Sequence, residues 1–117
     1  MLSLVWKVDF RETAVKNEDI LRAILEDLKA NRYERTMWWC VPEDLDTTSP
    51  IETIYQKYSL VDDVFTILSF TVPDDKKTAI IHFQWPLFAW CGDAKLQYTI
   101  DENKKVSFDH KVACWMY

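Results

Sequence analysis

A two-residue hydrophobic period runs through the second half of this chain, and it constrains the fold more than any other feature of the sequence. Strand-like runs cover residues 64–72, 78–85, 95–100 and 106–117, and each carries apolar side chains at alternate positions. The segments PDDKK and DENKK have the composition of tight turns. Because short connections join antiparallel neighbours, the pattern predicts a four-strand antiparallel meander.

The first half of the chain predicts two further strands. Residues 2–10 alternate between apolar and polar side chains, which is typical of a half-buried strand. The run RTMWWCV at residues 35–41 is aromatic and is followed by Pro42, so we expect a second strand there. Adjacent residues of a strand point to opposite faces, so one of Trp38 and Trp39 faces the core and the other faces away from it.

Two helices are also predicted. The segment NEDILRAILEDLKANRY, residues 17–33, has Ile and Leu at helical spacing and Asn17 as its N-cap. A shorter helix begins at SPIE, where Ser49 and Glu52 form a capping box. The expected fold class is α+β: an antiparallel sheet of about five to six strands, one long helix packed on a face and one short helix, in a single domain over residues 1–117.

Composition and charge exclude several classes of function. The single glycine, Gly92, rules out Gly-rich phosphate loops and dinucleotide fingerprints, and no cofactor is expected. A net charge of −5 and a pI near 4.9 oppose binding to nucleic acid or to an anionic membrane and favour a basic protein partner. The sequence shows neither a membrane span nor a signal peptide, so the cytoplasm is the expected compartment.

The cysteines and histidines form no recognisable site in the sequence. Cys40, Cys91 and Cys114 lack the CxxC spacing of a zinc site, so we expect no metal, and we expect buried, reduced thiols. His82 and His110 each lie inside a predicted strand, and either can be paired with Cys91 on paper, but no spacing requires such a pair. We therefore assign no catalytic residue, and the sequence leaves open whether the chain is an enzyme.

The aromatic residues carry the main functional hypothesis. The segment MWWCVPEDLD sets two tryptophans against acidic residues, and the connection QWPLFAWCGDA is aromatic where loops are usually polar, which indicates either a core plug or a binding surface. We expect an acidic protein-binding module that neutralises or inhibits a basic partner protein, in the manner of an immunity protein or a nuclease inhibitor. The residues expected at the partner surface are Trp38, Trp39, Glu43, Asp44, Asp46, Phe88 and Trp90.

An alternative hypothesis is a small-molecule-binding domain or a small enzyme, with an aromatic pocket between the curved sheet and the helix. The residues expected to line that pocket are Tyr55, Tyr58, His82, Trp85, Tyr98 and His110. A homodimer formed through an exposed sheet face is compatible with either hypothesis. The two differ in geometry, since a binding module exposes aromatic rings beside carboxylates whereas a pocket protein buries them around a cavity.

Overall fold

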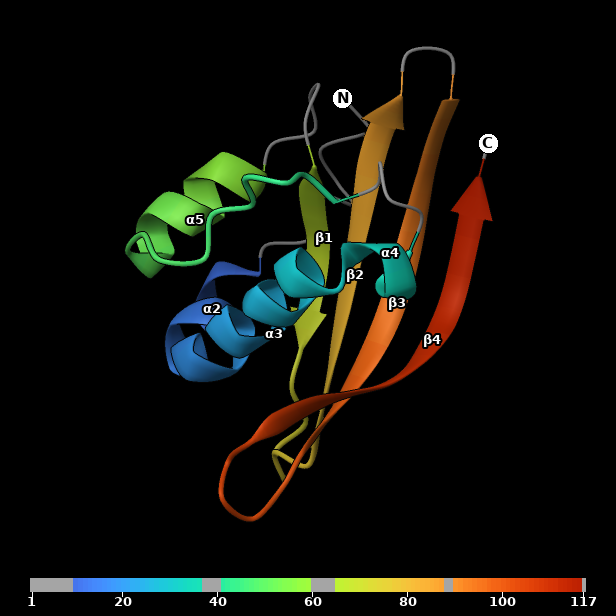
Figure 1. Ribbon diagram of the computed structural model, residues 1–117. Coiled ribbons are helices and arrows are strands. Elements are labelled where there is room, and N and C mark those ends of the chain that lie inside the picture. Colours follow the sequence, from blue (N-terminus) through green and yellow to red (C-terminus); the bar gives the residue numbers. More distant parts are fainter. Residues whose placement is uncertain (1–9, 37–40, 60–64, 88–89, 117) are drawn as a thin grey trace.

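The structure has helices in its first half and an antiparallel sheet in its second half, which confirms the α+β class. The computed structural model describes residues 10–36, 41–59, 65–87 and 90–116. Figure 1 shows the helices and strands in chain order: α2 (Arg11–Lys16), α3 (Glu18–Ala30), α4 (Arg32–Arg35), α5 (Ile51–Tyr58), β1 (Thr66–Thr71), β2 (Thr78–Leu87), β3 (Trp90–Ile100) and β4 (Val106–Met116).

The strands form one sheet in the order β1-β2-β3-β4, and every neighbouring pair is antiparallel. The meander predicted from the two-residue period is therefore confirmed. Its two tight turns lie where PDDKK and DENKK predict them, since β1 ends at Thr71 and β2 begins at Thr78, and β3 ends at Ile100 and β4 begins at Val106.

The connection predicted at residues 86–94 belongs largely to the sheet instead. β2 extends to Leu87 and β3 starts at Trp90, and these two residues are paired. Proline usually ends a strand because it cannot donate to the ladder. The missing donor has little effect at Pro86, because the pairing of β1 with β2 ends at Gln84. Beyond Gln84, β3 is the only described strand that pairs with β2.

The described sheet has four strands rather than five to six. Residues 1–9, which carry most of the first predicted strand, lie outside the described residues, and the chain then enters helix α2. The prediction of a strand at residues 35–41 is wrong for the end residues of that range, which the structure describes. Arg35 closes helix α4, where its guanidinium binds the Asp27 carboxylate, and the residues that flank 37–40 belong to no strand. Residues 37–40 themselves lie outside the described residues.

Asn31 divides the helix predicted over residues 17–33, and Asn17, which occupies the N-cap of α3 as predicted, separates that helix from the unpredicted helix α2. Asn17 separates α2 from α3 and Asn31 separates α3 from α4, with φ/ψ of −128°/44° and −123°/36°. Each side-chain amide donates to the carbonyl four residues earlier, at 3.0 Å for Thr13 and 3.2 Å for Asp27. Because such local bonds compete with the helical ladder, Asn17 does not cap α3 through its side chain as predicted.

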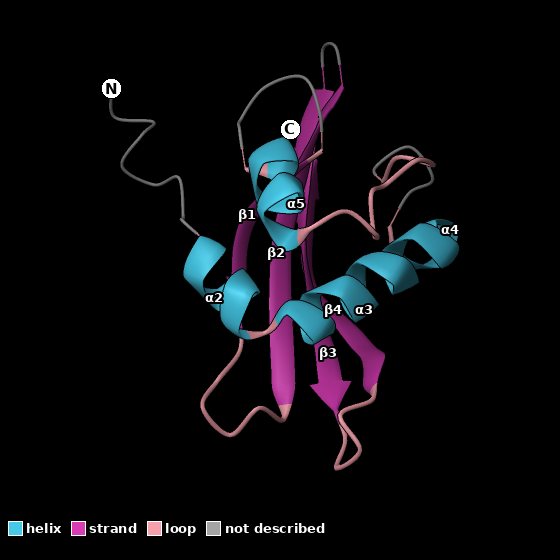
Figure 2. Ribbon diagram, turned by 90° about the vertical axis from the view of Figure 1, so that its left-hand side faces the viewer, coloured by secondary structure: helices cyan, strands magenta, loops and turns pink. Residues whose placement is uncertain are grey.

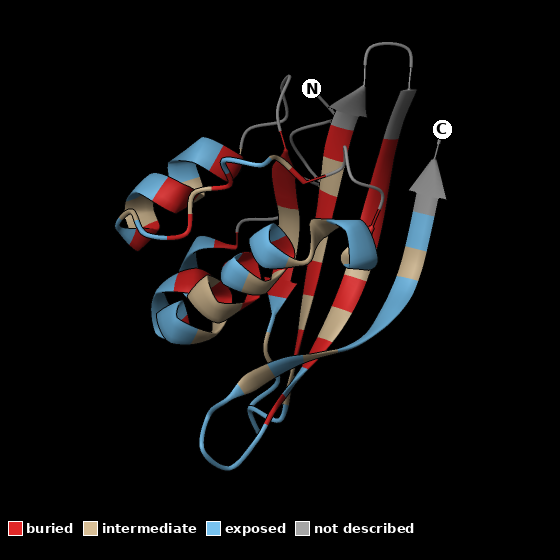
Figure 3. Ribbon diagram, viewed as in Figure 1, coloured by how far each residue is buried: buried red, intermediate tan, exposed pale blue. Residues whose placement is uncertain are grey.

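The helices lie against one face of the sheet and bury the core there (Figures 1 and 2). Alternate residues of β2 from Ala79 to Trp85 point into this core, and Figure 3 shows them as buried bands along the strand. The residues between them, such as His82, point to the opposite face. The buried residues of α3 are those that its helical spacing predicts, each contributing roughly 1.5–3 kcal/mol when fully buried: Leu21, Ile24, Leu25 and Leu28.

Strand β4 is an edge strand that bends along its length, and helix α3 lies against part of it (Figure 1). Two irregularities in its pairing with β3 accompany this bend. Cys114 is exposed on β4, so the expectation of a buried thiol is wrong at this position. Among the described residues, no helix is long and apolar enough to cross a membrane.

Candidate protein-binding surface

Asp27 fixes the turn that carries helix α4. Arg35 Nε and Nη2 donate to its two carboxylate oxygens at 2.7 and 2.9 Å, and the Tyr98 hydroxyl donates from the sheet at 2.7 Å. Burial opposes ionisation of Asp27, but the hydrogen bonds from Arg35 and Tyr98 outweigh it and lower the pKa of the carboxyl. Arg35 also stacks on the Phe108 ring, 4.1 Å from its centroid. Helix α4 is therefore held against both α3 and the sheet.

Arg32, the first residue of α4, connects an exposed ring to an exposed carboxylate. Its guanidinium lies 5.3 Å from the centroid of the Tyr33 ring, and its Nη1 atom lies 3.4 Å from Glu43 Oε1. Tyr33 is 67% exposed, and the Glu43 side chain is 84% exposed. Glu34 and Asp44 are exposed as well. We refer to Tyr33, Glu34, Glu43 and Asp44 as the acidic docking surface.

The loop that carries Glu43 and Asp44 is held in place by Asp46. Its carboxylate accepts the backbone N–H groups of Thr48 and Ser49 at 3.2 and 3.0 Å and the Lys57 ammonium at 3.0 Å. Hydrogen bonds from Ser49 are the main reason why the pKa of Asp46 is far below its usual range. Because Ser49 is engaged in this way, it does not form the predicted capping box, and Pro50 occupies the N-cap of α5.

The same loop is tied to the helices at two further points. Tyr58 accepts the backbone N–H of Asp46 through its hydroxyl oxygen at 2.8 Å. Arg22 Nη1 donates to the carbonyls of Thr47 and Ser49, both at 2.9 Å. Leu45 is buried beneath the loop. These contacts fix the backbone of the loop and leave the carboxylates of Glu43 and Asp44 outside.

The structure separates the three acidic residues of the expected partner surface. Glu43 and Asp44 are exposed, whereas the Asp46 side chain is only 12% exposed and serves the loop. Trp38, Trp39 and Phe88 lie outside the described residues, and only the backbone of Trp90 is described, in β3.

The structure places the residues expected to line an aromatic pocket in different surroundings. Tyr55 packs on Phe10 and Tyr58 on Phe65, with ring centroids 5.1 and 5.5 Å apart. Trp85 is buried in the core, and its Nε1 atom has no hydrogen-bond partner among the described residues. Three further members are dispersed: Tyr98 bound to Asp27, His82 on the opposite sheet face and His110 exposed on β4 beside Asp109.

His82 forms a pair that the sequence did not reveal. Its Nε2 atom lies 2.5 Å from Asp93 Oδ2 on the neighbouring strand, and the Asp93 side chain is buried. A carboxylate in this position orients an imidazole ring, as it does in acid–base catalysis. The same bond also satisfies two polar groups on a partly buried sheet face. Asp93 was missed because it falls in the segment predicted to be a connection.

Comparison with known proteins gives no guide to function, since no protein-family model, curated protein or solved structure matches this chain. Within the described residues, no group of three or more His, Cys, Asp or Glu side chains is placed to hold a metal ion. The acidic docking surface therefore rests on its own geometry. Sequence reasoning missed Tyr33 because it falls at the end of the predicted long helix, and only recognition of Asn31 as a helix break would have placed it on a separate turn.

Proposed function

We propose that this chain is an acidic protein-binding module that docks on a basic partner protein through the acidic docking surface, and that it neutralises or inhibits that partner. The observation that carries the proposal is the exposed Tyr33 ring beside exposed carboxylates, of which Glu43 makes one long contact with Arg32. Tyrosine is one of the residues most often found at the energetic centre of protein interfaces. Exposed carboxylates around it attract and orient a basic surface.

The rigidity of the surface supports the proposal. Helix α4 is tied to Asp27, and the loop that carries Glu43 and Asp44 is tied to Asp46, Tyr58 and Arg22. A partner that binds here orders few groups on this chain, so little of the contact energy is lost to conformational entropy. The net charge of −5 adds long-range attraction for a basic protein.

Affinity capture from a lysate of the host tests the proposal. We expect the tagged wild-type chain to retain one basic protein at low salt and less of it at moderate salt, because exposed charges are screened. Reversal of the two exposed carboxylates in E43K/D44K should weaken its binding by about tenfold or more, since like charges then face each other. Binding of the purified pair by calorimetry gives the ratio of affinities.

The matched control is D74K/E102K, which reverses two exposed carboxylates in the sheet turns and has the same net charge as E43K/D44K. The proposal predicts that this control retains the partner. Equal loss in both double variants would show that total charge, and not the acidic docking surface, determines binding. A partner that E43K/D44K still retains at full strength would place the interface elsewhere.

Substitution of the exposed ring separates aromatic contact from charge. Tyr33→Ala should release the partner, whereas Tyr33→Phe should keep most of the affinity because the ring remains. Both variants should unfold at the same denaturant concentration as the wild type, because the side chain is 67% exposed. Unchanged affinity of Tyr33→Ala would remove the ring from the interface.

A second candidate function, acid–base catalysis or small-molecule binding at the opposite sheet face, is favoured by the contact between His82 and Asp93. Thermal-shift screening of a small-molecule library against the wild type and His82→Gln tests it. Compounds that stabilise only the wild type would support a ligand site at His82. Identical sets of hits for the two proteins would exclude His82 from such a site.

A further inference from the structure

A groove at the turn end of the sheet brings together residues from three separate segments. It lies between the junction of α2 with α3 and the turns that join β1 to β2 and β3 to β4, and it encloses about 630 Å³. Pockets for small molecules occupy ~300–1,000 Å³, so its size suits such a ligand. It shares no residue with the acidic docking surface, and what it binds is independent of the proposed function.

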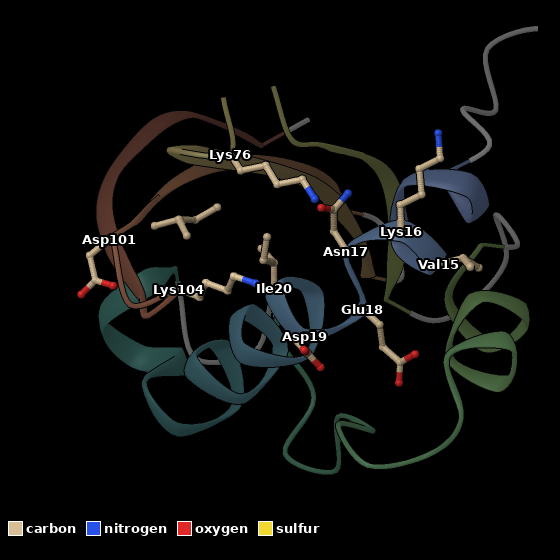
Figure 4. Close-up of a pocket in the computed structure, with 10 residues that line it drawn as sticks. Val15, Lys16, Asn17, Glu18, Asp19, Ile20, Lys76, Asp101 and Lys104 are labelled. Carbon is tan, nitrogen blue, oxygen red and sulfur yellow. The ribbon is translucent and has the colours of Figure 1, made fainter. Parts of the chain in front are cut away.

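Two lysines face the space of this groove. In Figure 4, the side chains of Lys76 and Lys104 extend towards Asn17 and Ile20. Within the described residues, neither lysine forms an ion pair. Ile20 and Ile100 supply apolar surface between them. The groove thus offers two ammonium groups over an apolar floor on a protein that is acidic overall.

The carboxylates at the rim do not neutralise these lysines. Figure 4 shows Glu18, Asp19 and Asp101 pointing away from the space between Lys76 and Lys104. Glu18 binds the Arg22 guanidinium at 2.7 Å. Asp101 Oδ1 accepts two backbone N–H groups of its own turn, each at 2.8 Å. The space between Lys76 and Lys104 is therefore bordered by two ammonium groups, while these three carboxylates point out of it.

Both lysines occupy backbone positions that favour glycine. Their φ angles are 52° for Lys76 and 65° for Lys104, and they are the non-glycine residues with positive φ in the described part of the chain. Each follows a turn closed by its own N–H, which donates at 2.9 Å to Pro73 or to Asp101. Glycine would adopt these φ angles without the Cβ clash that lysine incurs, so replacement of either lysine by glycine should not destabilise its turn.

Asn17 provides a third polar group at the groove. Its side chain is nine-tenths buried, and its Nδ2 atom is engaged with the Thr13 carbonyl. The Oδ1 atom has no hydrogen-bond partner among the described residues, although it can accept. A buried acceptor left unpaired is costly, and a donor brought by a ligand would remove that cost. Lys76 lies across this amide in Figure 4, so entry of a ligand requires the flexible lysine side chain to move.

We propose that this groove binds a small organic anion whose charged group lies between Lys76 and Lys104 and whose hydroxyl donates to Asn17 Oδ1. The two ammonium groups require a negatively charged ligand, and the unpaired amide oxygen requires that the ligand carry a hydrogen-bond donor. Ile20 and Ile100 accommodate its carbon skeleton.

Titration followed by amide chemical shifts tests this site with two matched probes, citrate and tricarballylate, which differ by one hydroxyl. We expect citrate to shift the amides of Asn17, Ile20, Lys76 and Lys104 saturably and to bind about tenfold more tightly than tricarballylate, because a hydrogen bond to a buried acceptor is lost with the hydroxyl. Inorganic phosphate, which has no carbon skeleton, should bind more weakly than citrate.

The variant K76G/K104G should lose citrate binding by about tenfold or more, since two charge-assisted hydrogen bonds disappear. Its melting temperature should equal or exceed that of the wild type, because glycine relieves both positive-φ positions. The control K77G/K105G makes the same chemical change at the neighbouring lysines, which do not line this groove, and should bind citrate as the wild type does.

Four results would overturn the proposal: no saturable shift with any of the three probes, equal affinity for citrate and tricarballylate, phosphate binding as tight as citrate binding, or equal loss of citrate binding in the two double variants. The first removes the site, the second removes the Asn17 contact, and the third removes the role of the carbon skeleton. The last would show that citrate binding depends on the net charge of the protein and not on Lys76 and Lys104.

Discussion

Two arginine–carboxylate contacts in this molecule have opposite roles. Asp27 accepts two short bonds from Arg35 and a third from Tyr98, and it lies between helix and sheet. Glu43 lies 3.4 Å from Arg32 and is 84% exposed. The same pair of residue types therefore stabilises the fold in one region and leaves a charge accessible to a partner in the other. The number of bonds and the degree of burial decide between these roles.

The largest expected effect on stability comes from Asp27→Ala. The change leaves the Arg35 guanidinium and the buried Tyr98 hydroxyl without their shared acceptor, so we expect the free energy of unfolding to fall by about 2–3 kcal/mol. Urea denaturation followed by circular dichroism measures it. A loss below about 1 kcal/mol would show that Asp27 does not anchor α4, since an exposed pair contributes no more than that.

The second largest effect concerns how stability depends on pH through Asp27 and Asp46. The pKa of Asp27 is lowered because bonds from Arg35 and Tyr98 outweigh burial, and that of Asp46 is lowered chiefly by Ser49. Carboxyls with depressed pKa contribute their stability above the ordinary value of 3.8, and this contribution is lost as the pH falls below it.

The urea midpoint of the wild type, measured from neutral pH into acid, should therefore fall steeply once the pH drops below the ordinary pKa of an Asp carboxyl. The variant D27N/D46N should start from a lower midpoint and show a flatter curve, because the two coupled protonations are absent. Parallel curves for the two proteins would mean that other carboxyls control acid unfolding.

A smaller loss is expected for Asp46→Ala. The loop loses an acceptor for two backbone N–H groups, as in the removal of a helix cap, so the free energy of unfolding should fall by about 1 kcal/mol. Denaturation of this variant beside Asp44→Ala, the neighbouring exposed carboxylate, gives the comparison. Equal stability of the two would contradict the structural role of Asp46.

The smallest effect on stability is expected for Glu43→Ala, at about 0.5 kcal/mol or less, because its contact with Arg32 is long and the Glu43 carboxylate itself is exposed. In the same variant we expect weaker capture of the basic partner. A large loss of stability in Glu43→Ala would erase the contrast with Asp27.

The sequence predicts the sheet well because its two-residue period is strong and its turns are short. It misses helix α2, which precedes Asn17, and it fails at Asn31, where a side-chain amide competes with the helix in a way that helical spacing does not reveal. It also fails at Asp93, since the pair with His82 requires β3 to begin before the predicted residue 95, so that Asp93 lies opposite Gln84. The exposure of Tyr33 depends in turn on the break at Asn31.

Of the expected partner surface, Glu43 and Asp44 are exposed while Asp46 is used by its own loop. Residue type alone could not distinguish them, because all three lie in one short acidic run. The difference arises from the turn that brings Thr48, Ser49 and Lys57 to a single carboxylate.

Hydrogen exchange of the chain with and without the captured basic protein tests the central claim most directly. We expect slower exchange in peptides that cover residues 32–35 and 41–46, with little change at the turns near Lys76 and Lys104. Protection confined to another region, such as edge strand β4, would contradict the assignment of the acidic docking surface.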